Sequence, residues 1–402
     1  MRILVVSEVF YPENFIINDL VLEWKARGHD VEVLTSYPSY PVSYVFDGYE
    51  NRGYKVENWD GVRIHRFPFI EGYRDSFTKK ILNYIKFVTE GRKVGKRLGG
   101  DFDLVFVSQT GPLTVALPAL MMRRKFDIPV AIWTQDIWPD AVFSYGIPNN
   151  FITRWALDLF IKYVYRRCDK IFVSSRRFAE TINKYVDSEI IYTPNWLKKV
   201  DNVKSNLILD KEKFNFTFTG NISRYQNLVN TIKGFIEADL KDCVLNIVGD
   251  GSYMEEVKNV AKKAEWNNIV FCGRLPYNEM HDILCQSDVL VLPLIADEGI
   301  QKTEPFKIQS YLDAGKPIYG VLGGSGKDII LENDLGLCAR PDDVNDIAHG
   351  FVAMLDFAQE NTDIVSENAK KLLHTRFNKE NVLNTFKQGI EDIKYEIKNN
   401  KL

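Results

Sequence analysis

ILVVSEVFYPENFIINDLVLEWKARGHDVEVL (residues 3–34) contains the pattern that decides the fold. Ile3–Val6 is a short apolar run, typical of a strand that is buried on both faces. Apolar residues then recur at helical spacing from Ile17 to Trp24, and a second strand pattern, Val31–Leu34, follows Gly28. This strand–helix–strand unit predicts a parallel sheet, because parallel neighbours need a crossover connection.

The same alternation recurs in two blocks. In the first block we expect strands at 104–107, 130–133 and 171–173, helices at 114–124 and 151–167, and a hairpin at Asp60-Gly61 that leads into Val62–His65. In the second block we expect strands at 214–219, 244–248, 269–272, 289–292 and 317–321, with helices at 227–238, 254–264, 279–286 and 307–314. From residue 343 the pattern is helical, and the last amphipathic helix covers about 379–398.

The two blocks predict two α/β domains of the doubly wound, Rossmann-like kind. A chain of 402 residues is longer than one hydrophobic core usually serves. The polar stretch 195–206 separates the blocks, so we place the domains at 1–195 and 207–378, with the last helix, 379–402, belonging to the first. In such sheets ligands bind at the carboxyl ends of the strands, and we expect those ends to line a cleft between the domains.

Composition excludes several classes of function. The net charge of −3 gives no reason to expect nucleic-acid binding. The five cysteines are scattered without metal-ligand or redox-pair spacing, which is typical of buried thiols in a reducing compartment, and no metal site is expected. The sequence has no run of 18 apolar residues, so we expect no membrane-spanning helix and a cytoplasmic location.

The loop after the first strand, residues 7–20, lacks the G-x-G-x-x-G pattern of nicotinamide and flavin enzymes. It carries Glu13, Asn14 and Asn18 instead, and we expect these side chains, with Gln109, to contact an acceptor. An ordinary strand-to-helix turn would explain the same loop equally well.

QDIWPD (135–140) also follows a predicted strand, which places Asp136 at the same sheet edge. We expect Asp136 to orient acceptor hydroxyls or to help move a proton. The alternative is that this aspartate caps the next helix.

The second block carries the groups expected to bind phosphates. Gly220–Arg224 follows its first strand and precedes a helix, so backbone N–H groups and Arg224 would favour an anion. In EPFKIQSYLDAGKPI (304–318), Lys307 is expected in the first turn of a helix that starts after Pro305. A positive charge there is repelled by the helix dipole, but a bound diphosphate would attract it. The catalytic residues are expected to be Asp136, Arg224 and Lys307, and the donor-binding residues Gly220, Gly249, Asp250 and Pro305, to which the family resemblance given below adds Asn221, Gln226, Arg274, Phe306, Gln309 and Ser310.

Residues 74–97 combine many lysines and arginines with interleaved apolar residues. A basic amphipathic segment of this kind can rest on anionic lipid headgroups. A solvated helix face is the alternative explanation.

Six motifs together resemble glycosyltransferase family 4, whose members are retaining enzymes of the GT-B fold. The branch that the chain resembles is that of bacterial O-antigen and capsule transferases similar to N-acetyl-L-fucosamine transferases. The motifs are YPENFIINDL (11–20), LTSYPSYP (34–41), QDIWPD (135–140), TPNW (193–196), TGNISRYQNL (219–228) and KIQSYLDAGKPI (307–318).

The resemblance implies a nucleotide diphosphate-sugar donor, with a UDP-N-acetyl-sugar favoured, bound by the C-terminal domain. It implies a glycan acceptor on a polyprenyl diphosphate, bound by the N-terminal domain, and transfer with retention. The nucleotide-sugar is a substrate, and no cofactor or metal is implied. Peripheral contact with the inner membrane through 74–97 and a last helix that packs on the N-terminal domain are also expected.

The chain departs from the family pattern at several positions. Asn221 and Gln226 stand where many members place an arginine and a lysine on the diphosphate, and Ser310 stands where a glutamate binds the ribose. Arg224, Lys307 and Gln309 are the substitutes that this chain offers. Two other functions stay open: a nucleotide-sugar epimerase, and a non-catalytic subunit that binds a nucleotide-sugar or a partner transferase.

Overall fold

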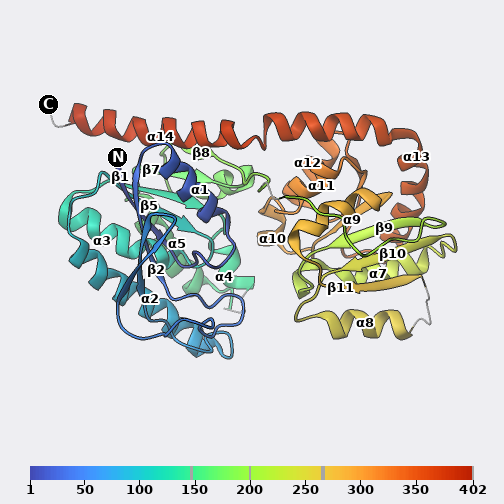
Figure 1. Ribbon diagram of the computed structural model, residues 1–402, viewed down its shortest axis with the longest axis horizontal. Coiled ribbons are helices and arrows are strands. Elements are labelled where there is room, and N and C mark those ends of the chain that lie inside the picture. The colour runs from blue at the N-terminus through green and yellow to red at the C-terminus, as the bar shows by residue number, and fades with distance from the viewer. Residues whose placement is uncertain (145–147, 199–200, 264–267, 401–402) are drawn as a thin grey trace. The chain divides into compact units, whose positions relative to one another are not determined.

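The computed structural model describes residues 1–144, 148–198, 201–263 and 268–400, which form two compact units. The first unit comprises Met1–Thr193 and the residues from Val382 on, and the second comprises Pro194–Asn381. Figure 1 shows a sheet with covering helices in each of them. The predicted α/β class is confirmed in both units.

The described residues of the first unit form an eight-stranded sheet with the order β3-β4-β2-β1-β5-β6-β7-β8. All neighbouring strands are parallel except β3 and β4, which form the hairpin predicted at Asp60-Gly61. The strands are β1 Arg2–Ser7, β2 Asp30–Ser36, β3 Lys55–Trp59, β4 Val62–Phe67, β5 Leu104–Gln109, β6 Val130–Thr134, β7 Lys170–Val173 and β8 Ile190–Tyr192. The helices are α1 Ile16–Ala26, α2 Phe77–Leu98, α3 Leu117–Phe126, α4 Asp140–Ser144, α5 Phe151–Tyr165 and α6 Arg176–Ile182, with a 3-10 turn, η1, at Leu113–Ala116.

The described residues of the second unit form a six-stranded, wholly parallel sheet with the order β11-β10-β9-β12-β13-β14. The strands are β9 Phe214–Thr219, β10 Cys243–Val248, β11 Ile269–Gly273, β12 Val289–Pro293, β13 Ile318–Val321 and β14 Gly336–Ala339. The helical elements are η2 Arg224–Gln226, α7 Leu228–Glu237, α8 Met254–Lys263, η3 Tyr277–Glu279, α9 Met280–Gln286, α10 Glu298–Lys302, α11 Ile308–Ala314, α12 Gly324–Glu332 and α13 Val344–Thr375. The strand β14 and the helices α10 and α12 were not predicted.

The segment predicted to link the domains bonds to the second unit in its described part, 195–198 and 201–206. The Val203 N–H donates to the Asn278 carbonyl at 3.0 Å, and the Ser205 hydroxyl donates to the Glu279 carboxylate at 2.8 Å. Residues 199 and 200 of the predicted linker lie outside the described residues.

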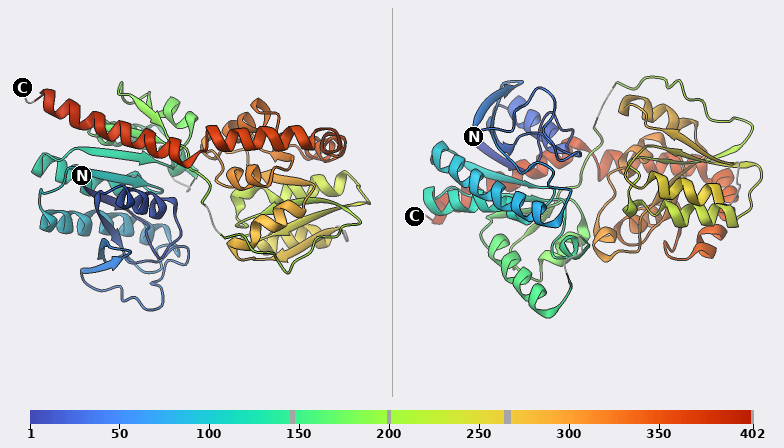
Figure 2. Two further views of the ribbon diagram at one scale, coloured as in Figure 1. Left: turned by 45° about the horizontal axis from the view of Figure 1, so that its top comes forward. Right: turned by 90° about the horizontal axis from the view of Figure 1, so that it is seen from below.

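Helix α14 (Lys379–Asn400) returns the chain to the first unit, as expected for the last helix. Its Phe386 is fully buried and lies among four aromatic rings, those of Trp24, Phe106, Trp133 and Phe172. Helices α1 and α14 therefore cover one face of the sheet, and α2 and α3 pack together on the other (Figure 2). The last helix of the chain is thus part of the core of the first unit.

Truncation of this ring should destabilise the first unit. We expect Phe386→Ala to lower the free energy of unfolding by about 3–5 kcal/mol, because it leaves a cavity between aromatic side chains. Urea unfolding followed by tryptophan fluorescence would measure it, since Trp24 and Trp133 contact the ring. Lys387→Ala, a change at the neighbouring half-exposed residue, is the control, and an equal loss in both variants would contradict the packing role of Phe386.

Candidate functional site

In the second unit, two glycines hold the carboxyl ends of three strands close together. The Gly220 N–H, after β9, donates to the Val248 carbonyl of β10 at 2.9 Å, and the Gly249 N–H donates to the Gly273 carbonyl of β11 at 2.8 Å. Gly220 and Gly249 have φ angles of 129° and 145°, and a Cβ at Gly249 would collide with the Gly220 carbonyl oxygen. Only glycine fits this close approach without strain.

Lys307 extends its side chain over this glycine edge. A Cβ added to Gly220 would lie 3.2 Å from the Lys307 ammonium, which donates to the Gln226 side-chain oxygen and lies 4.0 Å from the centre of the Phe218 ring. Burial lowers the pKa of Lys307 to about 7. The structure thus brings Gly220, Gln226 and Lys307 together, and no carboxylate among the described residues pairs with the lysine.

Both helices start within one residue of the predicted positions, since α7 begins at Leu228 and α11 at Ile308. Lys307 is the residue before α11, not part of its first turn. After Gly220 the chain makes only the short 3-10 turn that begins at Arg224, and the α-helix α7 begins later, at Leu228. Tight loops and 3-10 turns, which single-sequence periodicity does not reveal, occupy both positions.

The other predicted donor residues surround this edge. Asn221, Arg224, Asp250, Arg274 and Phe306 are exposed, whereas Pro305 is buried. Asp250 accepts a hydrogen bond from the Gly251 N–H at 2.8 Å, a contact typical of a turn.

Gln309 and Ser310 lie beyond Lys307 along α11. The buried Gln309 amide donates to the Asn195 carbonyl at 3.3 Å, and its side-chain oxygen has no partner in the described part of the chain. Ser310 is hydrogen-bonded to the Tyr277 phenol, and both line a cavity of about 530 Å³. From α11 this cavity is lined by Ser310 and Asp313, which share a helix face because they are three residues apart.

In the first unit, the loop after β1 is tied to the loop after β2 by the buried carboxylate of Glu13. Its oxygens accept hydrogen bonds from the N–H groups of Ser39 at 2.8 Å, Tyr40 at 2.7 Å and Phe10 at 3.0 Å. Asn18 donates to the Glu13 carbonyl at 2.6 Å, while Asn14 is exposed on the same loop. Glu13 therefore holds two loops in place, whatever else it contacts.

Seven buried side-chain polar atoms lack a hydrogen-bond partner among the described residues, and four of them lie at the ends of β5 and β6. These four are Ser108 Oγ and Gln109 Oε1, in the last two residues of β5, and Gln135 Nε2 and Trp138 Nε1, shortly after β6. The Gln109 amide itself donates to the Asp136 carbonyl at 2.8 Å, which joins the two strand ends. Since buried polar groups are nearly always satisfied, these atoms indicate a place for a polar ligand or for solvent.

Two desolvated carboxylates lie at the same edge. Burial raises the pKa of Asp136 to about 7, and burial together with the nearby Glu13 raises the pKa of Glu8 to about 7. Lys80 of α2 interacts electrostatically with both. Asp136 does not cap α4, which begins at Asp140; its carboxylate accepts from the N–H of the next residue, Ile137.

Sequence reasoning missed Glu8 as a candidate. The signal that could have found it is its position, because it directly follows the first strand, as Asp136 follows β6 after a single residue. Perturbed carboxylates at the ligand-binding edge of a parallel sheet are candidates for function.

The predicted basic segment 74–97 covers all but the last residue of α2, which Ser76 caps at its N-terminus. Phe77, Leu82 and Ile85 are exposed on it. A second exposed apolar surface, on α5, was not predicted: Phe151 is 84% and Trp155 58% exposed. No helix in the described ranges is long and apolar enough to cross a membrane.

Histidine, cysteine and carboxylate side chains form no cluster of three or more that could hold a metal ion within the described chain. His65 pairs with Glu32 at 2.7 Å, and His281 pairs with Asp313 at 2.9 Å. Cys168 and Cys243 are buried as expected, but Cys285 is exposed.

Family models match both units. Residues 14–196 match the glycosyl transferase 4-like domain, and residues 213–356 match the glycosyl transferases group 1 domain. The chain carries two glycosyltransferase domains. The predicted resemblance to glycosyltransferases is confirmed, whereas fucosamine specificity and retention stay predictions.

Curated relatives of these glycosyltransferase domains are distant in sequence. The chain is 24% identical to the putative colanic acid biosynthesis glycosyl transferase WcaI of Escherichia coli K12, over 98% of this chain and 100% of that one. It is 23% identical to the probable glycosyltransferase WbjE of Pseudomonas aeruginosa, over 60% of this chain and 63% of that one.

Solved structures share the fold. Sucrose-phosphate synthase from Thermosynechococcus elongatus superimposes with a TM-score of 0.70 at 14% identity, over 98% of this chain and 99% of that one. The E. coli trehalose-6-phosphate protein bound with UDP-2-fluoro glucose superimposes with a TM-score of 0.72 at 10% identity, over 97% of this chain and 99% of that one. The predicted GT-B fold is confirmed.

The carboxylates at the first unit's edge should make its stability depend on pH. An acid whose pKa is raised on folding stabilises the folded state below its unfolded pKa, and that contribution is lost as the pH rises through the folded pKa. We therefore expect Glu8→Gln to raise the free energy of unfolding by about 1–3 kcal/mol at pH 8 and to leave it almost unchanged at pH 4.

Urea unfolding at the two pH values would measure this effect. Glu50→Gln, at an exposed carboxylate of the same unit, is the matched control. If the difference in free energy of unfolding between Glu8→Gln and the parent protein is the same at both pH values, the carboxylate is not desolvated.

Proposed function

We propose that the protein transfers a sugar from a nucleotide diphosphate-sugar, with a UDP-N-acetyl-sugar favoured, to a glycan acceptor carried on a polyprenyl diphosphate. The second unit would bind the donor and the first unit the acceptor. The observation that carries the donor assignment is the desolvated ammonium of Lys307 beside the close-packed glycines of β9 and β10. The name of the relative WcaI, in colanic acid biosynthesis, supports a surface polysaccharide as the product.

The donor would bind along α11. Its diphosphate would lie between Lys307 and the exposed Arg224, and its nucleoside would occupy the cavity lined by Ser310 and Tyr277. Burying an uncompensated ammonium is unfavourable, so a diphosphate that pairs with Lys307 recovers the free energy that its desolvation costs. The UDP-2-fluoro glucose bound in a structure of the same fold supports a UDP-sugar as the donor.

Transfer would proceed with retention at the anomeric carbon. The acceptor hydroxyl attacks on the face from which the diphosphate leaves, and a leaving diphosphate oxygen takes the hydroxyl proton. Lys307 and Arg224 would stabilise the charge that develops on the diphosphate, in place of a metal ion. Glu8 and Asp136 would orient the acceptor sugar by accepting hydrogen bonds from its other hydroxyls.

We also propose that the first unit makes peripheral contact with the cytoplasmic face of the inner membrane. The exposed apolar side chains of α2 and α5 support it, and each helix carries basic residues such as Lys79 and Lys162. Aromatic and cationic side chains on one amphipathic surface favour the headgroup region of an anionic bilayer.

Nucleotide binding should weaken as the pH rises above 7. An anionic diphosphate favours the charged lysine, so binding raises the pKa of Lys307 above its free value of about 7. Between those two pKa values, binding takes up a proton, and the Kd for UDP should rise by up to about tenfold per pH unit. Calorimetric titrations at pH 7, 8 and 9 would show the slope, and the same slope in Lys307→Met would contradict the assignment.

Activity should depend on the same side chain. We expect Lys307→Ala to lose about 2–4 kcal/mol of transition-state stabilisation, seen as a fall in kcat/KM for the donor. A thermal-shift screen of UDP-, GDP-, ADP- and dTDP-sugars first identifies the donor, and Lys327→Ala, at an exposed lysine of α12, is the control. Donor binding without turnover, when acceptors are supplied, would instead favour a non-catalytic subunit, and conversion of donor without acceptor would favour an epimerase.

A further inference from the structure

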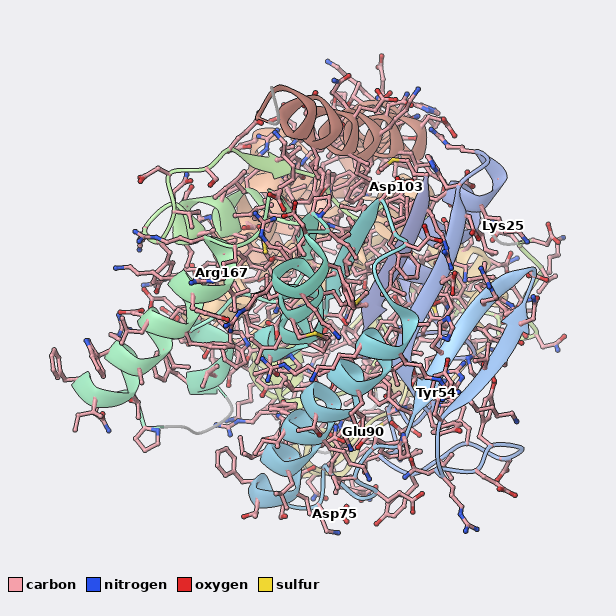
Figure 3. The ribbon with its side chains drawn as sticks, turned by 90° about the vertical axis from the view of Figure 1, so that its left-hand side faces the viewer. Lys25, Tyr54, Asp75, Glu90, Asp103 and Arg167 are labelled. Carbon is pink, nitrogen blue, oxygen red and sulfur yellow. The ribbon has the colours of Figure 1, made fainter. Side chains whose placement is uncertain are left out.

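An apolar cavity of about 310 Å³ lies within the first unit, beside α2. Helix α2 contributes Ile81, Tyr84, Ile85 and Val88 to its lining, and Trp138 and Val142 line it as well. In Figure 3 this helix begins next to Asp75 and passes Glu90. The volume is within the range of about 300–1,000 Å³ that is common for small-molecule sites.

Folding alone does not explain this cavity. Helix α2 already packs a separate face into the core, through Phe87, Gly91 and Val94. A surface helix needs only one apolar face for that purpose. The second apolar face, which includes Ile81, Ile85 and Val88, lines the cavity and leaves Ile85 53% exposed.

The lining of the cavity is almost wholly apolar and includes one charged side chain. Lys80 is its only charged lining residue in the described part of the chain, and it interacts electrostatically with Glu8, Asp136 and Arg74. The Trp138 indole also lines the cavity, and its buried N–H lacks a hydrogen-bond partner in the described part of the chain. The cavity therefore offers apolar walls and one cation, Lys80, which interacts with the carboxylates of the candidate acceptor site.

We propose that this cavity binds the hydrocarbon chain of a lipid-linked acceptor, with the lipid phosphate next to Lys80. An amphiphile with a hydrocarbon chain and an anionic head matches both the apolar walls and the ammonium. The inference rests on the proposed function, since it assigns the lipid part of the same acceptor.

The placement also orders the reaction within a sequence. Because Lys80 interacts electrostatically with both Glu8 and Asp136, the sugar that these carboxylates orient would lie near the lipid phosphate and not at the far end of a long glycan. The acceptor is therefore a short lipid-linked saccharide. The class of reaction that supplies it is transfer of a first sugar phosphate to a lipid phosphate.

A pair of variants on α2 tests the site. Ile85 and Leu82 are 53% and 49% exposed on the same helix, but only Ile85 lines the cavity. With farnesyl diphosphate as the probe, below its aggregation concentration, we expect Ile85→Asp to raise the Kd at least tenfold and Leu82→Asp to change it by less than twofold. Both variants should keep the Tm of the parent protein, because both positions are half-exposed.

Inorganic diphosphate separates the head from the chain. We expect it to bind at least tenfold more weakly than farnesyl diphosphate and to be insensitive to Ile85→Asp. Equal binding of the two probes, or an equal loss in both variants, would overturn the proposal. A third outcome is that both variants lose flotation with anionic vesicles and the parent protein shows no saturable binding of farnesyl diphosphate. This result would assign α2 to the membrane surface and would also overturn the proposal.

Two further measurements keep this inference distinct from the proposed function. UDP binding should be unchanged in Ile85→Asp, and farnesyl diphosphate binding should be unchanged in Lys307→Ala. Transfer to a soluble saccharide without any farnesyl diphosphate binding would overturn the cavity assignment and leave the glycosyltransferase proposal standing. Farnesyl diphosphate binding that depends on Ile85, without transfer from any donor, would support the cavity and reject the proposed activity.

Discussion

Parallel pairing of strands is the constraint on which the rest of the molecule depends. Each parallel neighbour requires the chain to cross back over the sheet, so successive strands end at the same edge and their loops meet there. In the second unit this joins the ends of three strands, since the Gly220 N–H donates to the Val248 carbonyl and the Gly249 N–H donates to the Gly273 carbonyl. In the first unit it brings the residues after β1, β5 and β6 together, although they are distant in sequence.

Both edges hold ionisable groups that folding alone would disfavour. Glu8 and Asp136 are desolvated in the first unit, and Lys307 is desolvated in the second. Burial of such groups lowers the stability of the fold unless a partner compensates. Groups of this kind are often found at functional sites, where a ligand is the partner. These groups match the proposed ligands, since carboxylates accept hydrogen bonds from sugar hydroxyls and an ammonium pairs with a diphosphate. In each unit, the buried ionisable groups that lack a compensating partner therefore indicate the kind of ligand that the unit would bind.

Local sequence was sufficient to predict most strands and helices, because apolar runs such as Ile3–Val6 and the helical repeat from Ile17 to Trp24 carry strong periodic signals. It failed at β14, whose four residues, Gly336–Ala339, include no β-branched side chain. It could name Lys307 and Asp136, but not the burial that shifts their pKa values, which arises from residues on other elements. Glu8 and the cavity beside α2 were missed because both depend on which strand ends and helix faces meet in the folded unit.

The return of α14 to the first unit has a consequence for synthesis on the ribosome. A chain is made from its N-terminus, and domains generally begin to fold in that order. The aromatic cluster of Trp24, Phe106 and Phe172, however, is completed by Phe386, which emerges only after the entire second unit. The unit that is made first is therefore finished last, and during translation the α14 side of its sheet is an uncovered apolar surface that a chaperone could recognise.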